Sequence, residues 1–199
     1  GEVLLGHLRY GTQGKNNAEF CHPFIKRHTI PSRNLALAGN FNLVNTEELF
    51  GLVNIDPGEF QRQSDLAAMM EVLYHFVVKA DEAFPGHMDI ARVLKKTIPL
   101  FDGGFNFSGI LGNGDAFIMR DAHGIRPSYY YINDEVIVAA SERAAIRTAF
   151  NVGENEVMEL MPGKALIVKA DGTYSIDQIV EPKERKACSF ERIYFSRGS

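Results

Sequence analysis

The sequence predicts a layered α+β fold and not a parallel β-α-β winding. Two long helical patterns, over 64–79 and 88–98, lie between early and later strand patterns. After residue 105 the chain consists mainly of short strands joined by hairpin turns. Strands joined by tight turns are antiparallel, and their apolar faces need helices or a second sheet to cover them.

Before residue 100 the patterns predict two strands and three helices. Residues 2–10 and 34–39 are strand-like and end in polar or glycine-rich turns. Asn45 followed by Glu48 matches a capping box and begins a short helix that ends near Val53. The other two helices are the long patterns named above, whose apolar residues recur at helical spacing.

The later half of the chain predicts three hairpins and one more helix. The turn at Gly112–Asp115 between two apolar segments is a strong hairpin signal. We expect the helix over 141–150, with Ser141 as its N-cap. The paired strands are expected at 105–111 with 116–120, 129–132 with 136–140, and 165–169 with 174–179.

The composition is that of an ordinary globular domain. Of the 199 residues, 45% are hydrophobic and 23% are charged, which argues against disorder and against a coiled coil. The net charge of −4 offers no attraction to nucleic acid or to an anionic membrane, and no apolar run has the length of a membrane helix. Cys21 and Cys188 lie far apart and match neither a disulfide framework nor a zinc site, so we expect a cytoplasmic protein with no metal in this domain.

Three groups of polar residues follow strands or begin a helix. Arg9 and Thr12 lie in a glycine-punctuated turn, Asn40 and Phe41 end the second strand, and Asp65 begins the long helix. A guanidinium and a carboxylate suit the two charged groups of an α-amino acid, and an amide beside a backbone N–H suits an oxyanion. Ordinary roles also stay open, because polar residues are common at strand ends and Asp65 fits the first turn of a helix.

A thiol-based site at Cys21 and His22 is not favoured. Neighbouring residues of an extended segment point to opposite sides, which separates a thiol from its base. We therefore expect Cys21 to be buried and unreactive, and His22 to enter a turn with Pro23.

Several motifs together resemble the class II glutamine amidotransferase domain. They follow the order of that family and span nearly the whole chain: GHLRYGTQG at 6–14, GNFNLVN at 39–45, RDAHGIRP at 120–127, ASE at 140–142, MPG at 161–163 and CSFERIYFSR at 188–197. The last segment and the Gly-Ile-Arg-Pro turn are similar to the amidophosphoribosyltransferase branch in particular.

The resemblance implies an N-terminal-nucleophile hydrolase fold, which is a four-layer α-β-β-α sandwich of two antiparallel sheets, and we expect it to be incomplete at the N-terminus. In this class an amino-terminal cysteine attacks the glutamine amide, with its own α-amino group as the base. By the same resemblance, Arg9 holds the glutamine carboxylate, Asp65 its ammonium group, and Thr12 lines the pocket. Asn40 and the backbone N–H of Phe41 stabilise the oxyanion.

The implied activity is that of a glutaminase domain in de novo purine synthesis. Ammonia from glutamine passes to a phosphoribosyltransferase domain of the same polypeptide, which makes 5-phosphoribosylamine from phosphoribosyl pyrophosphate. We expect that second domain to use Mg²⁺ and to lie outside this sequence, so that 1–199 form one amidotransferase domain. The complete protein is expected to be a homo-oligomer.

The chain departs from the family pattern at two positions, and a third position matches a ligand found in only some relatives. Position 1 is glycine and no cysteine precedes Arg9, so we expect this chain to lack the nucleophile and to be inactive alone. Phe41 replaces a glycine, which would strain the backbone if that position needs a positive φ. Cys188 coincides with an iron–sulfur ligand of some relatives, but we expect no cluster because the other ligands would lie outside this chain.

Two other functions stay open on the sequence alone. A domain that has lost its nucleophile would bind glutamine or pack against a partner without catalysis. A different class II amidotransferase would carry a sugar-isomerase or synthetase domain downstream. Residues upstream of position 1 in the gene distinguish the first alternative from an enzyme, and the downstream domain distinguishes the second.

Overall fold

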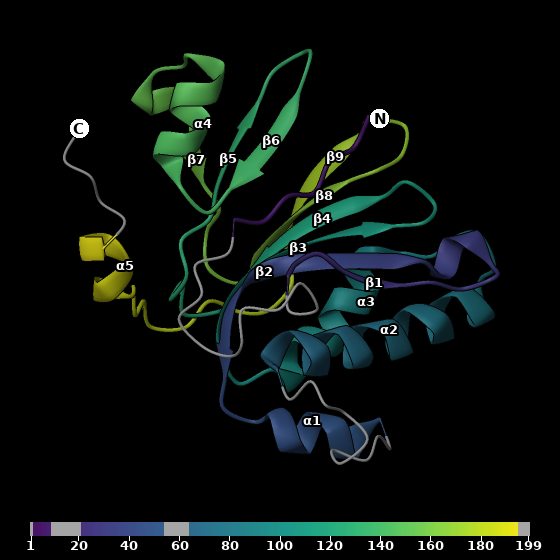
Figure 1. Ribbon diagram of the computed structural model, residues 1–199. Helices are drawn as coiled ribbons and strands as arrows, with labels where there is room; N and C mark the ends of the chain where they lie inside the picture. The colour runs from purple at the N-terminus through teal and green to yellow at the C-terminus, as the bar shows by residue number, and fades with distance from the viewer. Residues whose placement is uncertain (1, 9–20, 54–63, 195–199) are drawn as a thin grey trace.

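The computed structural model describes residues 2–8, 21–53 and 64–194, and its strands form two antiparallel sheets. The larger sheet has six strands in the order β1-β2-β3-β4-β8-β9, and the smaller has three in the order β6-β5-β7 (Figure 1). The larger sheet comprises β1 (Phe24–Lys26), β2 (Leu35–Leu43), β3 (Gly103–Leu111), β4 (Ala116–Arg120), β8 (Lys164–Val168) and β9 (Tyr174–Gln178). The smaller sheet comprises β5 (Tyr129–Ile132), β6 (Ile137–Ala140) and β7 (Met158–Glu159).

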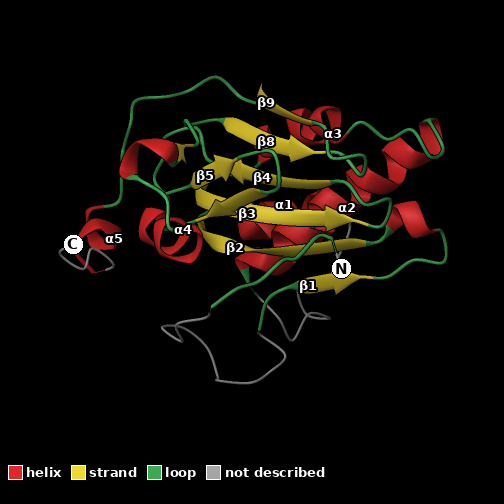
Figure 2. Cartoon of the chain, turned by 90° about the horizontal axis from the view of Figure 1, so that it is seen from above, coloured by secondary structure: helices red, strands yellow, loops and turns green. Residues whose placement is uncertain are grey.

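Helices and sheets stack in four layers, which confirms the predicted α-β-β-α class. One face of the larger sheet is covered by α1 (Thr46–Leu52), α2 (Asp65–Ala83) and α3 (Ile90–Thr97), and its other face by the smaller sheet (Figures 1 and 2). Beyond the smaller sheet lies α4 (Arg143–Phe150), and α5 (Ser189–Tyr194) follows at the C-terminal end. Short 3₁₀ turns occur at η2 (Pro31–Arg33), η3 (Ile98–Leu100) and η4 (Glu154–Glu156).

Two apolar clusters hold the layers together. The larger cluster lies between the three covering helices and the six-stranded sheet, and it includes the fully buried Leu73 and Phe107. The smaller cluster lies between the two sheets and joins Ile118 to Leu160. Successive strand side chains point to opposite faces, so Met119 packs with the helices while its neighbour Ile118 packs with the second sheet.

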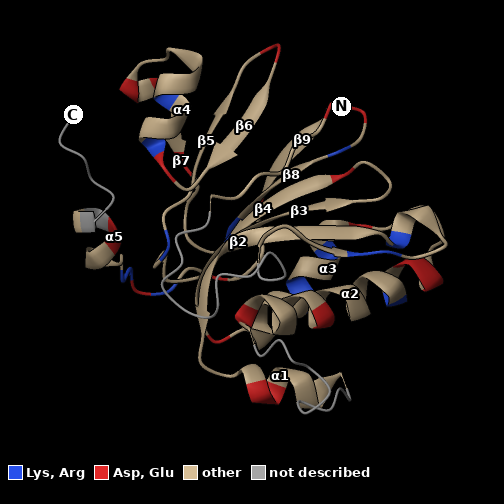
Figure 3. Ribbon diagram, viewed as in Figure 1, with Lys and Arg blue, Asp and Glu red and all other residues tan. Residues whose placement is uncertain are grey.

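Lysines and arginines are interspersed with acidic residues over the described part of the chain (Figure 3). This mixed distribution agrees with the small net charge of −4. Among the helices in the described ranges, none combines the length and the apolar character needed to cross a bilayer.

The prediction of a first strand is wrong for residues 2–8, which have no regular secondary structure. The apolar pattern there is not buried, because Leu4 and Leu8 are 89% and 100% exposed. The sequence also missed β1, β7 and α5, which are too short to display a periodic pattern.

Two predicted helix caps are also wrong, although both helices form. Asn45 precedes α1 without capping it, because its side chain reaches across to η3, donating Nδ2–H to Leu100 O at 2.9 Å and accepting from Asp102 N at 3.1 Å. The N-cap of α4 is Glu142 and not Ser141. In both cases tertiary contacts or backbone geometry override the local capping preference.

Asp81 ties α2 to the 3₁₀ turn that precedes β2. The residue is only 2% exposed and accepts hydrogen bonds from Arg33 Nε at 2.7 Å and Ser32 Oγ at 2.8 Å. The hydrogen bond from the Arg33 guanidinium lowers the pKa of Asp81 below its ordinary value of 3.8, and the bonds from Ser32 and Gly86 add to this against the opposing effect of burial.

We expect Asp81→Ala to lower the free energy of unfolding by about 3 kcal/mol near pH 7, because it leaves the mostly buried Arg33 without its partner. The pKa of Asp81 is lower in the folded state, so its contribution is complete above the unfolded value and is lost as the pH falls through the folded one. Urea unfolding should therefore show the difference between wild type and variant shrinking below about pH 4.

The matched control is Glu82→Ala, which removes a carboxylate 3.6 Å from the same guanidinium but 58% exposed. This substitution should lower the free energy of unfolding by less than about 1 kcal/mol. Equal losses from the two substitutions would contradict the structural role given to Asp81.

Candidate functional site

Strand β2 brings two of the predicted site residues to the start of α2. Asn40 and Phe41 lie near the end of β2, and Leu43 donates its N–H to Asp65 Oδ2 at 2.9 Å. Asp65 is the first residue of α2, and the hydroxyl of the N-cap residue accepts from the first turn at 3.2 Å. Asp65 is therefore both a first-turn acid and a side chain fixed to β2 two residues beyond Phe41.

The backbone N–H of Phe41 points away from β3. On either side of it, Gly39 donates its N–H to His22 Nδ1 at 3.4 Å and Leu43 donates to Asp65, so neither donates to β3. Every second residue of an antiparallel strand directs its N–H to the same side. The Phe41 N–H therefore lies on the edge of β2 where Asp65 is held, which is a suitable place for an oxyanion donor.

Phe41 does not strain the backbone. Among the described non-glycine residues only Asn151 has a positive φ, and Phe41 pairs with Phe105 in the regular β2–β3 ladder. The ring is half-buried against the apolar cluster beneath the helices and is stacked on His22 with 5.7 Å between ring centroids. The strain considered from the sequence does not arise, because the position has ordinary strand geometry.

Asn40 faces the opposite side of the sheet, next to its cross-strand partner Asn106. Glycine precedes Asn40 because the strands approach closely there: a Cβ at Gly39 would lie 2.5 Å from Asn106 O. Asn106 is 5% exposed and donates Nδ2–H to Pro127 O at 2.6 Å. The Asn40 side chain donates Nδ2–H to Glu191 Oε1 at 2.7 Å.

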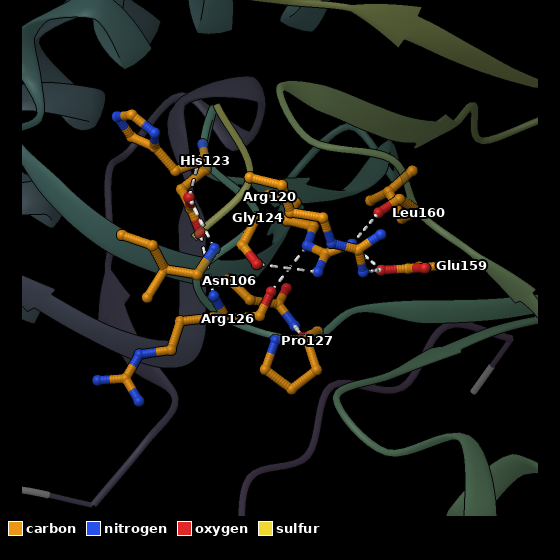
Figure 4. Close-up of polar contacts among 11 residues, drawn as sticks. Asn106, Arg120, His123, Gly124, Arg126, Pro127, Glu159 and Leu160 are labelled. Carbon is orange, nitrogen blue, oxygen red and sulfur yellow. Dashed lines mark hydrogen bonds and ion pairs between the residues drawn. The ribbon is translucent and has the colours of Figure 1, made fainter. Parts of the chain in front are cut away.

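The turn over 120–127 packs against this face and contains a buried arginine. Arg120 is 2% exposed, and its guanidinium donates to the carbonyl oxygens of Arg126 (2.7 Å), Leu160 (2.6 Å) and Gly124 (3.1 Å) (Figure 4). It also pairs with Glu159 at 2.7 Å. Burial of this charge is compensated only in one conformation of the turn, so the arginine fixes the turn.

Asp121 fixes the same turn from its other side. It is 1% exposed, and its two carboxylate oxygens accept four backbone N–H groups at 2.9 to 3.3 Å. Three donors are in the turn, at residues 123, 125 and 126, and the fourth is Phe105 of β3. These bonds connect the turn to β3 and direct the Arg126 side chain away from Arg120 (Figure 4).

Arg126 forms an ion pair with Glu191, whose Oε1 also accepts the hydrogen bond from Asn40. Glu191 is 6% exposed, although it lies on the short helix α5. Both residues lie within the family motifs at 120–127 and 188–197, but the sequence alone predicted no role at the site for either. Their position inside those motifs could have indicated a role, because a charged residue within a motif that matches a family closely is a candidate for a buried ion pair.

Glu142 lies close enough to Glu191 for the two carboxylates to repel. Burial raises the pKa of Glu142 above its ordinary value of 4.5, and the charge of Glu191 adds to the rise. Asn40 is therefore adjacent to a group of two acids and one arginine, of which Glu191 and Arg126 are paired.

The predicted ligands Arg9 and Thr12 lie outside the described residues. Cys21 is exposed, so the prediction of a buried thiol is wrong: it lies at the rim of a hollow of about 440 Å³ beside α2. Cys188 is half-exposed and donates its N–H to Ile125 O at 3.1 Å. In the described ranges no three His, Cys, Asp or Glu side chains gather in a way that could hold a metal, so Cys188 has no further ligands there.

Comparison with protein families identifies the class. Residues 21–148 match the family described as "Glutamine amidotransferase domain". The match covers more than half of the chain and includes Asn40, Phe41 and Asp65. The chain therefore belongs to the glutamine amidotransferase domain family.

Curated relatives point to one branch of that family. The chain is 31% identical over 197 residues to the amidophosphoribosyltransferase of Bacillus subtilis, with 99% of this chain and 38% of the relative covered. It is 29% identical to the amidophosphoribosyltransferase of Archaeoglobus fulgidus, with 99% and 40% covered. The chain thus spans about two fifths of the length of these relatives.

Two solved structures share the fold. One is described as glutamine phosphoribosylpyrophosphate amidotransferase from B. subtilis complexed with ADP and GMP, with a TM-score of 0.72, 26% identity, and 96% of this chain and 38% of that chain covered. The other is described as the allosteric regulatory enzyme of purine biosynthesis, with a TM-score of 0.73, 28% identity, and the same coverage. The similarity thus extends over nearly the whole chain.

We expect Glu142→Gln to increase stability at neutral pH. The pKa of Glu142 is higher in the folded state, so the charged form destabilises the fold above that pKa, and the penalty disappears as the pH falls towards the unfolded value. The gain should therefore be largest near pH 7.5 and small near pH 4, measured by thermal unfolding. Glu135→Gln, on the exposed β5–β6 turn, is the control, and a gain that persists unchanged in acid would contradict the assignment.

Proposed function

We propose that this chain is the glutamine-hydrolysing domain of an amidophosphoribosyltransferase. Its role would be to release ammonia from glutamine for a phosphoribosyltransferase domain that makes 5-phosphoribosylamine from phosphoribosyl pyrophosphate. The observation that carries the proposal is the end of β2, which places the Phe41 N–H on the strand edge where Asp65 is held and the Asn40 amide on a face of the sheet next to that edge. The matches to amidophosphoribosyltransferases, which cover 99% of this chain, support the particular branch.

Some of the proposed residues bind the amino-acid end of glutamine, and the others stabilise the oxyanion. Asp65 receives the ammonium group of glutamine, and Arg9 receives its carboxylate, with Thr12 beside it. These charges fix the amino-acid end of the substrate, so the side-chain amide extends to a defined place. Asn40 and the Phe41 N–H then bind the amide oxygen.

The chemistry is hydrolysis of an amide through a thioester. In this class a cysteine thiolate adds to the amide carbon, and the carbonyl oxygen becomes an oxyanion that Asn40 Nδ2–H and the Phe41 N–H stabilise. Collapse of the tetrahedral intermediate breaks the C–N bond, and the nitrogen leaves as ammonia after protonation. Water then cleaves the thioester, so glutamine and water give glutamate and ammonia.

The proposal predicts that Asn40→Ala reduces kcat for glutamine hydrolysis by about 100- to 1,000-fold, the loss expected for one oxyanion donor. The test uses the full-length natural polypeptide that carries this chain and measures glutamate formation. Asn155→Ala, an exposed asparagine in η4, is the control and should keep wild-type kinetics. Wild-type protein that hydrolyses no glutamine would instead support a non-catalytic domain.

Arg9→Ala should mainly raise KM for glutamine, by about 100-fold, because a bidentate arginine–carboxylate contact is made in both ground and transition states. The same variant should keep its activity with free ammonia, which needs no glutamine site. Arg27→Ala, an exposed arginine, is the control. Unchanged glutamine kinetics in Arg9→Ala would refute its role.

A further inference from the structure

We propose that Glu191 is a positioning residue for glutamine hydrolysis, which holds the side-chain amide of Asn40 so that its free N–H faces the oxyanion. The proposal rests on the function proposed above. Its basis is one shared atom: Glu191 Oε1 accepts Asn40 Nδ2–H at 2.7 Å and also pairs with the Arg126 guanidinium. The contact joins residues 151 positions apart in the sequence.

The hydrogen bond determines which end of the Asn40 amide points where. An asparagine side chain rotates through broad, nearly equivalent orientations, and its oxygen and nitrogen ends are similar in size. An ionised carboxylate can only accept hydrogen bonds, so it attracts the NH₂ end and repels the carbonyl end. With one N–H donated to Glu191, the second N–H is left to donate, and the amide oxygen cannot turn towards a developing negative charge.

Arg126 makes this arrangement compatible with oxyanion chemistry. An unpaired carboxylate next to the site would oppose the negative charge of the tetrahedral intermediate. The guanidinium neutralises Glu191 on the oxygen that holds Asn40, and the buried position of Glu191 keeps the contact from being screened by solvent. Glu142 is also close to Glu191, so its carboxylate adds a second negative charge there. The Glu191–Arg126 ion pair is neutral as a unit and adds no net charge next to Asn40.

The fold supplies both members of the pair on fixed backbone. The segment before α5 runs along the turn at 120–127, and its N–H groups at residues 183, 186 and 188 donate to the carbonyl oxygens of residues 122, 123 and 125 at 2.8, 3.0 and 3.1 Å. The buried Arg120 and Asp121 fix that turn. The turn at 120–127 therefore fixes both Arg126 and the segment that carries Glu191. A supporting residue on such a fixed segment can keep a hydrogen-bond donor in place.

Two conservative variants of the full-length natural protein test the proposal. Glu191→Gln keeps the length but loses the charge, and its amide oxygen stays turned towards Arg126, which can only donate, so it still accepts from Asn40. Glu191→Asp keeps the charge but is one methylene too short. We expect Glu191→Asp to lower kcat by about 10- to 100-fold, the loss typical of a misplaced group, and Glu191→Gln to lower it by less than about fivefold. KM should stay within about threefold for both, since Glu191 does not contact glutamine.

A role limited to the ion pair with Arg126 gives the opposite order, with Glu191→Asp more active than Glu191→Gln, and that order would overturn the proposal. The matched control is Asp115→Asn, which neutralises another buried acid. Asp115 lies in the turn between β3 and β4, and its carboxylate pairs with Lys169 at 2.9 Å. This substitution should leave kcat unchanged. Thermal unfolding of each variant checks that the protein is folded at the assay temperature.

A double variant shows whether Glu191 acts through Asn40. Asn40→Ala combined with Glu191→Asp should be no slower than Asn40→Ala alone, because the residue to be positioned is already absent. Losses that multiply would mean that Glu191 acts independently, which overturns the positioning role. Active wild type with unaffected Glu191 variants refutes this inference alone, whereas inactive wild type refutes the proposed function and this role with it.

Discussion

The arrangement around the site depends on two adjacent buried charges at the end of β4, Arg120 and Asp121. A buried guanidinium or carboxylate is tolerated only when its hydrogen-bonding capacity is filled, and here the partners are mostly backbone groups of one turn. The turn over 120–127 is therefore restricted to a single conformation. That conformation presents Pro127 O to Asn106, directs Arg126 to Glu191, and offers carbonyl oxygens to the segment before α5.

This constraint also explains how a site can be built from distant parts of the chain. Asn40, the proposed oxyanion donor, comes from β2, Asp65 from the start of α2, and Glu191, the hydrogen-bond partner of Asn40, from the last helix described. Each group is placed by a backbone that is fixed independently, by the β2–β3 ladder, by the N-cap of α2, or by the turn. Placement on such rigid elements is what a pre-organised catalytic site requires.

The replacement of glycine by Phe41 is informative about what the family needs at this position. The residue lies in a regular strand with its ring among the apolar residues beneath the helices, so the side chain does not alter the direction of the backbone N–H. The function proposed for this position uses only that N–H. Glycine is needed two residues earlier instead, where a Cβ at Gly39 would collide with β3.

The sequence by itself determined the fold class, most helices and hairpins, the family and the segment that carries Asn40, because periodic burial, turn chemistry and motif order are local properties. It failed at residues 2–8, at the caps of α1 and α4, and at Cys21, where burial depends on what packs nearby. Only the tertiary structure decided that Glu191 and Arg126 belong beside Asn40. That contact spans most of the chain, and no local pattern encodes a hydrogen bond between segments that meet only after the sheets have stacked.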